Sequence, residues 1–332
     1  MRLDAPAEGE SALIERIARR VGQASVPDAF RLVLGIGDDT AALQVGEQTL
    51  LWTADMLLEG VHFRLDWIDP ASLGWKSLAV NLSDIAAMGG TPAGALLSLA
   101  LPAERIGAWL DAFVDGLAEC AQTYGVALLG GDTNRAEQVV IDVSVLGVVA
   151  GQPVPRSGAR AGDWLLTTGA LGGSRAGLHA LMAGEASAID LASHFRPIPR
   201  LQVGVLAREL GATAMMDLSD GLAADLPKLL QASGVGAVVY AAQVPVHPAA
   251  AQWAQAHGLD PVAFAIAGGE DYELLIAAPP PVAQRLLERV PAETGVPLTH
   301  IGEVIAAQEV WLQRAEGGRE SFAIGGWDHF RA

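Results

Sequence analysis

Acidic residues stand beside glycines at four places where an expected strand ends. Glycine adopts positive φ or lets a ligand approach the backbone closely, and carboxylates supply hard oxygen ligands. One Gly-Asp pair is an ordinary turn, but four of them together favour a metal-binding site. The four segments are residues 37–39, 130–133, 217–221 and 268–271, and Asp55 follows a strand expected at 50–53.

Strand and helix patterns are mixed in both halves of the chain, without a strict βαβ repeat, which predicts an α+β protein. The turn-rich sequence Gly-Gln-Pro-Val-Pro at 151–155 predicts a boundary between two mixed α/β domains, 1–150 and 151–332. Acidic segments lie on both sides of this boundary, so the active site is expected in the cleft between the domains. Strands are expected at 31–35, 40–45, 48–53, 126–129, 139–149, 164–168, 212–216, 237–240, 272–277 and near 301 and 310, and helices at 11–21, 70–88, 106–124, 222–232, 281–290 and from 174.

The helix expected at 70–88 combines an apolar stripe with a polar one. Alanine and valine fill much of its remaining surface, so it is expected to be mostly buried, and a buried carboxylate must be neutralised, paired or metal-bound. The alternative is that the polar stripe faces solvent and carries an ordinary helix acid. The apolar stripe consists of Leu78, Leu82 and Ile85, and the polar stripe of Ser77, Asn81 and Asp84.

Charge and composition exclude several classes of protein. The chain has 332 residues, 38 acidic and 21 basic, with a formal net charge of −17, so it lacks the basic surface of a nucleic-acid binder. Only Lys76 and Lys228 are lysines, which argues against a Lys-rich membrane-binding face. Cys120 is the single cysteine and excludes a disulfide framework. The first twenty residues carry Asp4, Glu8, Glu10 and Glu15, unlike a targeting segment, in which a basic stretch is followed by an apolar one, so we expect no targeting segment and a cytoplasmic protein.

The common nucleotide-binding motifs do not occur. A P-loop sequence and the protein-kinase motifs are absent. The sequence Gly-Ala-Leu-Gly-Gly at 169–173, between a strand and a helix, is compatible with a phosphate cradle and equally with a plain tight turn.

Taken together, the motifs resemble the thiamine-monophosphate kinase family, which belongs to the PurM-like (aminoimidazole ribonucleotide synthetase-like) superfamily. They follow the family order from near residue 30 to the C-terminus. The matching segments are Gly-Ile-Gly-Asp-Asp at 35–39, Thr-Ala-Asp-Met-Leu-Leu-Glu-Gly-Val-His-Phe at 53–63, Lys-Ser-Leu-Ala-Val-Asn-Leu-Ser-Asp-Ile-Ala-Ala-Met-Gly at 76–89, Gly-Gly-Asp-Thr at 130–133, Arg-Ser-Gly-Ala-Arg-Ala-Gly-Asp at 156–163, Asp-Leu-Ser-Asp-Gly-Leu at 217–222, Gly-Gly-Glu-Asp-Tyr-Glu-Leu at 268–274 and Gly-Trp-Asp-His-Phe at 326–330.

The resemblance implies two PurM-like domains, ATP-dependent phosphorylation of thiamine monophosphate to thiamine diphosphate, several Mg²⁺ ions, and a homodimer formed through the N-terminal strands. It assigns the catalytic centre to Asp39, Asp217 and Asp220. It assigns ATP binding to Gly131, Asp132, Arg156 and Ser219, and substrate binding to His62, Glu270 and Trp327. The implied metal ligands are Asp39, Thr53, Ala54, Asp55, Asp84, Asp132, Asp217 and Asp220.

Two positions depart from the family pattern. Ala54 stands where a hydroxyl residue is common, so only its carbonyl could bind a metal, and Trp327 stands where tyrosine is common. An indole there could stack on a flat cationic ring.

The assignments agree with the chemistry of phosphoryl transfer. Mg²⁺ ions would neutralise the two phosphate chains that must meet, Arg156 would hold phosphate oxygens in a bidentate fork, and no Ser-His or Cys-His pair suggests a covalent relay.

Two other interpretations remain open at this point. Selenophosphate synthetase and aminoimidazole ribonucleotide synthetase belong to the same superfamily, although the first lacks support because no Cys/Lys pair lies near the N-terminus. A non-catalytic sensor of divalent cations or nucleotides is the alternative from another class. Turnover of ATP that depends on thiamine monophosphate would distinguish these possibilities.

Overall fold

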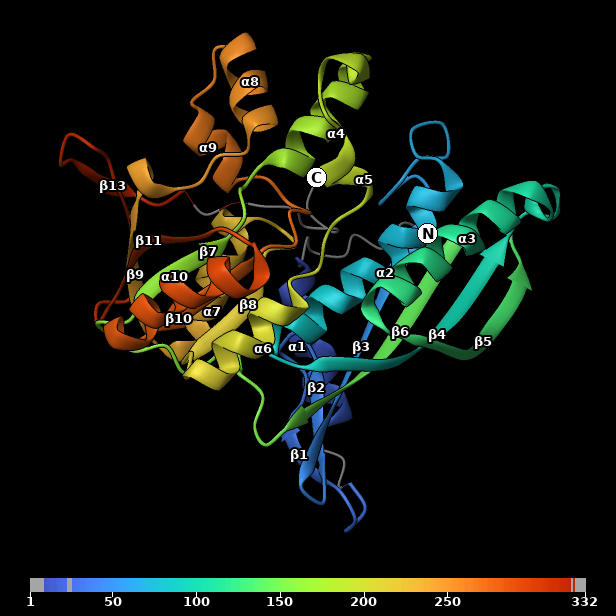
Figure 1. Ribbon diagram of the computed structural model, residues 1–332, viewed down its shortest axis with the longest axis horizontal. Coiled ribbons are helices and arrows are strands. Elements are labelled where there is room, and N and C mark those ends of the chain that lie inside the picture. Colours follow the sequence, from blue (N-terminus) through green and yellow to red (C-terminus); the bar gives the residue numbers. More distant parts are fainter. Residues whose placement is uncertain (1–8, 23–25, 324, 326–332) are drawn as a thin grey trace, which may run out of the picture.

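Two β-sheets, one from each half of the chain, organise the computed structural model, which describes residues 9–22, 26–323 and 325 (Figure 1). The first sheet has the strand order β1-β2-β3-β6-β4-β5, antiparallel except for β4–β5. Its half of the chain contains α1 (Glu10–Val21), β1 (Arg31–Leu34), β2 (Ala41–Val45), β3 (Gln48–Leu58), α2 (Pro70–Ala87), β4 (Thr91–Leu101), η1 (Ala103–Arg105), α3 (Ala108–Tyr124), β5 (Ala127–Arg135) and β6 (Val140–Ala150).

The second sheet has the order β13-β12-β9-β11-β7-β10-β8, antiparallel except for β12–β9. Its half contains β7 (Trp164–Thr168), α4 (Gly173–Ala183), η2 (Ala186–Ala188), α5 (Ala192–Phe195), α6 (Leu201–Leu210), β8 (Ala214–Asp217), α7 (Leu222–Ser233), β9 (Gly236–Tyr240), η3 (Ala241–Gln243), α8 (Pro248–Ala256), α9 (Pro261–Ile266), β10 (Leu274–Ala278), α10 (Pro280–Thr294), β11 (Leu298–Ile305), β12 (Val310–Gln313) and β13 (Arg319–Ser321).

One face of the N-terminal sheet is covered by helices and the other is open. In β6 every second residue is buried, as in Ile141, Val143 and Val145, and these side chains join one core with α2 and α3. On the opposite face, β3 pairs with β6 and exposes Trp52 and Met56, which are 54% and 53% exposed. We call this surface the open face.

Helix α2 lies between the two sheets (Figure 1). Asp69 caps its N-terminus by accepting a hydrogen bond from the Ser72 N–H, and Pro70 occupies its first turn. Its C-terminal end crosses α6, where a Cβ on Gly204 would lie 2.0 Å from the Ala86 carbonyl oxygen. Only glycine permits this close approach, which fixes the C-terminal half of the protein against α2.

A continuous apolar core crosses between the halves of the chain at this point. Ala86 and Ala87 of α2 are buried together with Val203 and Ala207 of α6. Beyond α6, this core continues to α10 and the C-terminal sheet.

The structure confirms the mixed α/β class and most expected elements, and it corrects several. Thr91–Leu101 forms a strand, β4, that the sequence did not predict, and residues 130–133 lie inside β5 rather than in a turn. Asp55 lies inside β3, which continues to Leu58. Helices α5, α6, α8 and α9 and the strand β13 were not predicted. Within the described residues, none of the helices has the length and apolarity that crossing a bilayer requires.

Candidate active site

Three carboxylates from distant parts of the chain meet where α2 faces the second sheet. Asp39 lies just before β2, Asp84 in the last turns of α2, and Asp217 at the end of β8. One oxygen atom from each lies within 4.8 Å of the others. Two of the carboxylates thus come from the first half of the chain and one from the second, as the cleft hypothesis expects.

Hydroxyl groups hold two of these carboxylates in place. The Thr53 hydroxyl donates to Asp84 Oδ2 at 2.5 Å, and the Ser83 hydroxyl donates to Asp217 Oδ2 at 2.6 Å across the two halves. Asn81, one turn before Asp84, accepts a hydrogen bond from the backbone N–H of Asp55 at 3.0 Å. The polar stripe of α2 therefore faces the site rather than solvent.

Burial and mutual repulsion raise the pKa of every carboxyl group in this cluster. Burial is the main cause for Asp39 and Asp55, whose pKa values rise to about 6, and neighbouring carboxylates contribute to both shifts. For Asp84 and Asp217 the same two causes raise the pKa well above the ordinary value. Without a cation, the cluster thus retains protons near neutral pH.

The donor set fits a hard divalent cation. Asp39 Oδ2 is buried and accepts no hydrogen bond from the described residues, which leaves a carboxylate oxygen free for a ligand. Carboxylate and hydroxyl oxygens are the ligands that Mg²⁺ uses in proteins. The residues present therefore suit Mg²⁺.

Arg156 places a guanidinium group beside the acids. Its Nη2 donates to Asp39 Oδ1 at 2.6 Å, and its backbone N–H donates to the Asp38 carboxylate. Its Nε is buried without a hydrogen-bond partner among the described residues. Because an unpaired buried N–H is costly, this atom is suited to an anionic ligand.

Asp220 lies at the other side of the cluster and is paired with Lys228. The Lys228 ammonium contacts Asp220 Oδ2 at 2.6 Å and Asp225 Oδ1 at 2.8 Å. The backbone N–H of Asp220 donates to Asp225, which is fully buried. The position of Asp220 is thus fixed by α7.

A second group of polar residues surrounds Glu270. Its carboxylate contacts Lys76 Nζ at 2.9 Å and His194 Nδ1 at 3.3 Å, and the proximity of His62 also lowers its pKa. Two expected substrate residues, His62 and Glu270, therefore lie near each other. Lys76 and His194 were not predicted as members of the site, and the one available signal was a lysine in a helix expected to be mostly buried.

Gly131 and Asp132 lie away from the acid cluster. Both belong to β5, which is three strands from β3, or about 14 Å at the usual strand spacing. Asp132 aligns through Ser98 and Asp142 with Met56, on the open face, and accepts from Asn134. A Cβ on Gly131 would lie 1.7 Å from the Leu97 carbonyl oxygen, so this strand requires glycine there.

The other three expected site residues are Ser219, Ala54 and Trp327, and each has a different position. The Ser219 carbonyl accepts the backbone N–H of Glu270 at 2.6 Å, which links the metal and substrate segments. Ala54 has its side chain exposed on β3 between Thr53 and Asp55. Trp327 lies outside the described residues.

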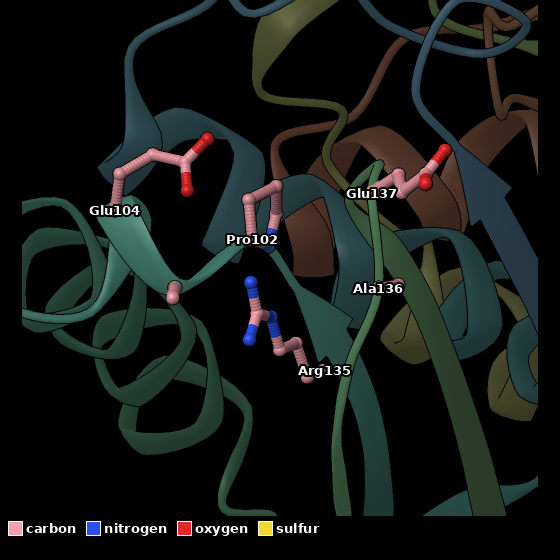
Figure 2. A pocket seen from close by; sticks show the side chains of 6 residues that line it. Pro102, Glu104, Arg135, Ala136 and Glu137 are labelled. Atoms are coloured by element: carbon pink, nitrogen blue, oxygen red, sulfur yellow. The ribbon is translucent and has the colours of Figure 1, made fainter.

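A surface hollow of about 510 Å³ lies apart from these residues, at the ends of β4 and β5. Figure 2 shows the Arg135 side chain extending into it toward Pro102, with Glu104 and Glu137 at its margins. It contains none of the expected site residues, so the candidate site rests on the acid cluster and not on this hollow.

Comparisons with known proteins identify the family of the chain. The N-terminal domain of AIR synthase related protein matches residues 37–149, and its C-terminal domain matches residues 160–313. Thiamine-monophosphate kinase of Escherichia coli (strain K12) is 39% identical over 330 residues, covering 97% of this chain and 98% of that protein. The same enzyme of Salmonella typhimurium (strain LT2) is 40% identical over 332 residues, with the same coverage.

Solved structures extend the likeness to the fold. The structure of AaThiL complexed with AMPPCP and TMP has a TM-score of 0.82 and 32% identity, covering 99% of each chain. Sequence, fold and the clustered acids agree, and the chain belongs to the thiamine-monophosphate kinase family of AIR synthase related proteins.

Proposed function

We propose that this protein transfers the terminal phosphoryl group of ATP to thiamine monophosphate and so forms thiamine diphosphate, the last step in the biosynthesis of that cofactor. Membership of the family supports this activity, as does the AaThiL complex with AMPPCP, an analogue of ATP, and TMP. The observation that carries the proposal is the meeting of the Asp39, Asp84 and Asp217 carboxylates within 4.8 Å. Such a cluster suits a reaction between two phosphate chains.

The metal ligands of this site are proposed to be acids and oxygens from both halves of the chain. Bound Mg²⁺ would neutralise the phosphate charge and orient the terminal phosphoryl group. The orphaned Asp39 Oδ2 supports this set. The ligands are Asp39, Asp55, Asp84, Asp132, Asp217 and Asp220, the Thr53 hydroxyl and the Ala54 carbonyl.

Two groups of residues hold the two substrates. Arg156 directs its unpaired Nε to a phosphate oxygen, and Ser219 lies on the segment beside Asp220. His62, Glu270 and Trp327 receive the thiamine end. The substrate phosphate already carries an anionic oxygen, so it needs no general base and attacks the terminal phosphorus of ATP directly. No phosphorylated enzyme forms on the way.

We also propose a homodimer in which the open face is buried. Exposed Trp52 and Met56 give this face the apolar character of an interface. Gly131 and Asp132 lie about 14 Å from Asp55 in the same chain. If they bind ATP phosphates, a second subunit must therefore supply them. The domains of each subunit are 1–150 and 151–332, and the location is the cytoplasm.

The decisive experiment measures the products of the purified protein. ATP with thiamine monophosphate and Mg²⁺ should give ADP and thiamine diphosphate in equal amounts, and EDTA should abolish both. ATP alone should remain intact, and thiamine without its phosphate should give no product. Tight binding of ATP with no turnover would instead identify a nucleotide sensor and refute the proposed activity.

A further inference from the structure

The chain has only two lysines, and both lie at the proposed site. Every other residue in its Lys+Arg total is an arginine. Lys228 pairs with Asp220 near the acid cluster. Lys76 lies in α2 and is 1% exposed, one of the largest side chains in the described part of the chain that are so fully buried. A buried ammonium group costs several kcal/mol unless it is well paired, so its partners indicate its role.

All recorded partners of Lys76 belong to the second half of the chain. Its Nζ contacts Glu270 Oε1 at 2.9 Å and donates to the His194 carbonyl oxygen at 3.1 Å. The His194 ring contacts the other oxygen of Glu270 and also the Ser174 hydroxyl, at 2.8 Å from Nδ1. Burial, together with the nearby Lys76 charge, lowers the pKa of His194 to about 4. Its ring therefore touches the carboxylate as a neutral group, and Lys76 supplies the charge.

The backbone of the segment that carries Glu270 is strained, and this conformation sets the direction of the Glu270 side chain. Glu270 and Tyr272 have φ values of 62° and 51°, the only positive values among described residues other than glycine. Such conformations are unfavourable for residues other than glycine and persist where neighbouring contacts impose them. Asp271 supplies one such contact by accepting the N–H of Gly172 at the start of α4.

Charge explains why Glu270 needs a cation beside it. Burial alone would raise the pKa of this carboxyl group, but the Lys76 ammonium holds the pKa below its ordinary value. About a quarter of the Glu270 side chain remains exposed, at 26%. It therefore presents an ionised carboxylate to the site.

We propose that Lys76 is a positioning residue for substrate recognition, which with His194 fixes the Glu270 carboxylate toward the cationic thiamine moiety of the substrate. This inference rests on the proposed function. Lys76 touches no reacting atom in this scheme and acts through Glu270 alone. Its loss should therefore weaken binding of thiamine monophosphate and leave the binding of ATP unchanged.

The test compares steady-state constants of purified variants. Lys76→Met keeps the length of the side chain and removes its charge, and should raise KM for thiamine monophosphate about tenfold or more. KM for ATP should stay within about twofold of the wild-type value, because the substitution weakens the binding of thiamine monophosphate alone. Lys76→Arg, which keeps the charge, should restore much of the loss. A KM for thiamine monophosphate equal to that of wild type in Lys76→Met would overturn the proposal.

A matched control separates positioning from stability. Arg200 forms a comparable buried pair with Glu273, three residues after Glu270, at 2.5 Å. Arg200→Met should lower the melting temperature and leave KM for thiamine monophosphate within about twofold of wild type. If it raised that KM as much as Lys76→Met does, general destabilisation would explain the effect and the proposal would fail.

A double-mutant cycle tests whether Lys76 acts through Glu270. Glu270→Gln should raise the same KM, and adding Lys76→Met to it should cause no further increase. Effects that multiply would show that Lys76 acts independently, against the proposal. Wild-type protein that converts ATP but not thiamine monophosphate would refute the proposed function itself, which is a distinguishable result.

Discussion

Individual acidic residues of the site are unfavourable for the folded protein until a cation joins them. Asp39, Asp84 and Asp217 bring three carboxylates within 4.8 Å, and burial removes the water that would screen them. Their raised pKa values record this cost as bound protons. Binding of Mg²⁺ should displace those protons, which couples metal affinity to pH.

The stability of the metal-free protein should fall as the pH rises. Asp39 and Asp55 titrate near 6 when folded and near 3.8 in their ordinary state, so the folded protein binds more protons in that window. The free energy of unfolding therefore decreases as pH rises through it. In EDTA the melting temperature should be lower at about pH 8 than at about pH 5. Saturating Mg²⁺ should shrink this difference, and an EDTA melting temperature that rises with pH would contradict the prediction.

Asp84→Asn should separate stability from function. The amide keeps the shape of the side chain and cannot ionise, so it removes the repulsion that a charged Asp84 would add to the cluster. The variant should therefore melt in EDTA at or above the wild-type temperature. Its stabilisation by Mg²⁺ and ATP should shrink, because one ligand is lost, and turnover should fall by orders of magnitude. If Asp84 were only structural through its bond with Thr53, the variant would melt lower and retain turnover.

At the scale of elements, α2 connects the two ends of the site. Lys76 and Asp84 are eight residues apart, so they lie about 12 Å apart along the helix axis. One contacts the substrate-side carboxylate and the other the acid cluster. The position of α2 against α6 therefore sets both ends at once.

Gly204→Ala should disturb both stability and turnover through this contact. Its new Cβ would lie 2.0 Å from the Ala86 carbonyl oxygen, so the helices must separate. Overpacking of this kind costs about 1–3 kcal/mol, and the shift should also move Ser83 away from Asp217. Gly318→Ala, which meets no atom within 4 Å, is the matched control. Thermal melts and turnover of both variants check this, and wild-type values for Gly204→Ala would exclude a close helix contact.

Local patterns predicted the elements better than they predicted the contacts between them. The helix at 70–88 has a cap signal at Asp69 and a clear polar stripe, and α2 matches it closely. The strand Thr91–Leu101 was missed because its apolar run, broken by Pro92 and Gly94, lacks alternation. The partners of Lys76 could not be predicted, because they depend on tertiary packing of residues about 120 and 190 positions away.

The glycine-rich segment at 169–173 shows the same limit. The sequence left a phosphate cradle and a plain turn equally open. The Gly172 N–H donates to the Asp271 carboxylate at 2.6 Å, so the protein's own side chain occupies the N-terminus of α4. The plain structural interpretation therefore holds at this turn.

At the scale of the whole molecule, the open face and the position of Asp132 both favour a dimer. Trp52 and Met56 are half exposed on a surface that no helix covers within the described part of the chain, and Asp132 shares that face. In one chain, Asp132 is separated from Asp55 by β6 and β4. A dimer through the open face would bury the apolar residues and carry Asp132 toward the site of the partner.

Mixed dimers test whether Asp132 acts in the partner's site. Asp132→Ala and Asp84→Asn should each abolish turnover in homodimers. A heterodimer of the two variants, purified by different tags, contains one site with both Asp84 and the partner's Asp132 intact, so it should recover about half of wild-type turnover. If Asp132 served its own chain, both sites of the heterodimer would carry a lesion and turnover would remain absent.

Trp52→Glu, which places a charge on the open face, should yield monomers in sedimentation and lose turnover, because the monomer lacks the partner's Asp132. A fully active monomer would exclude both the interface and the shared site.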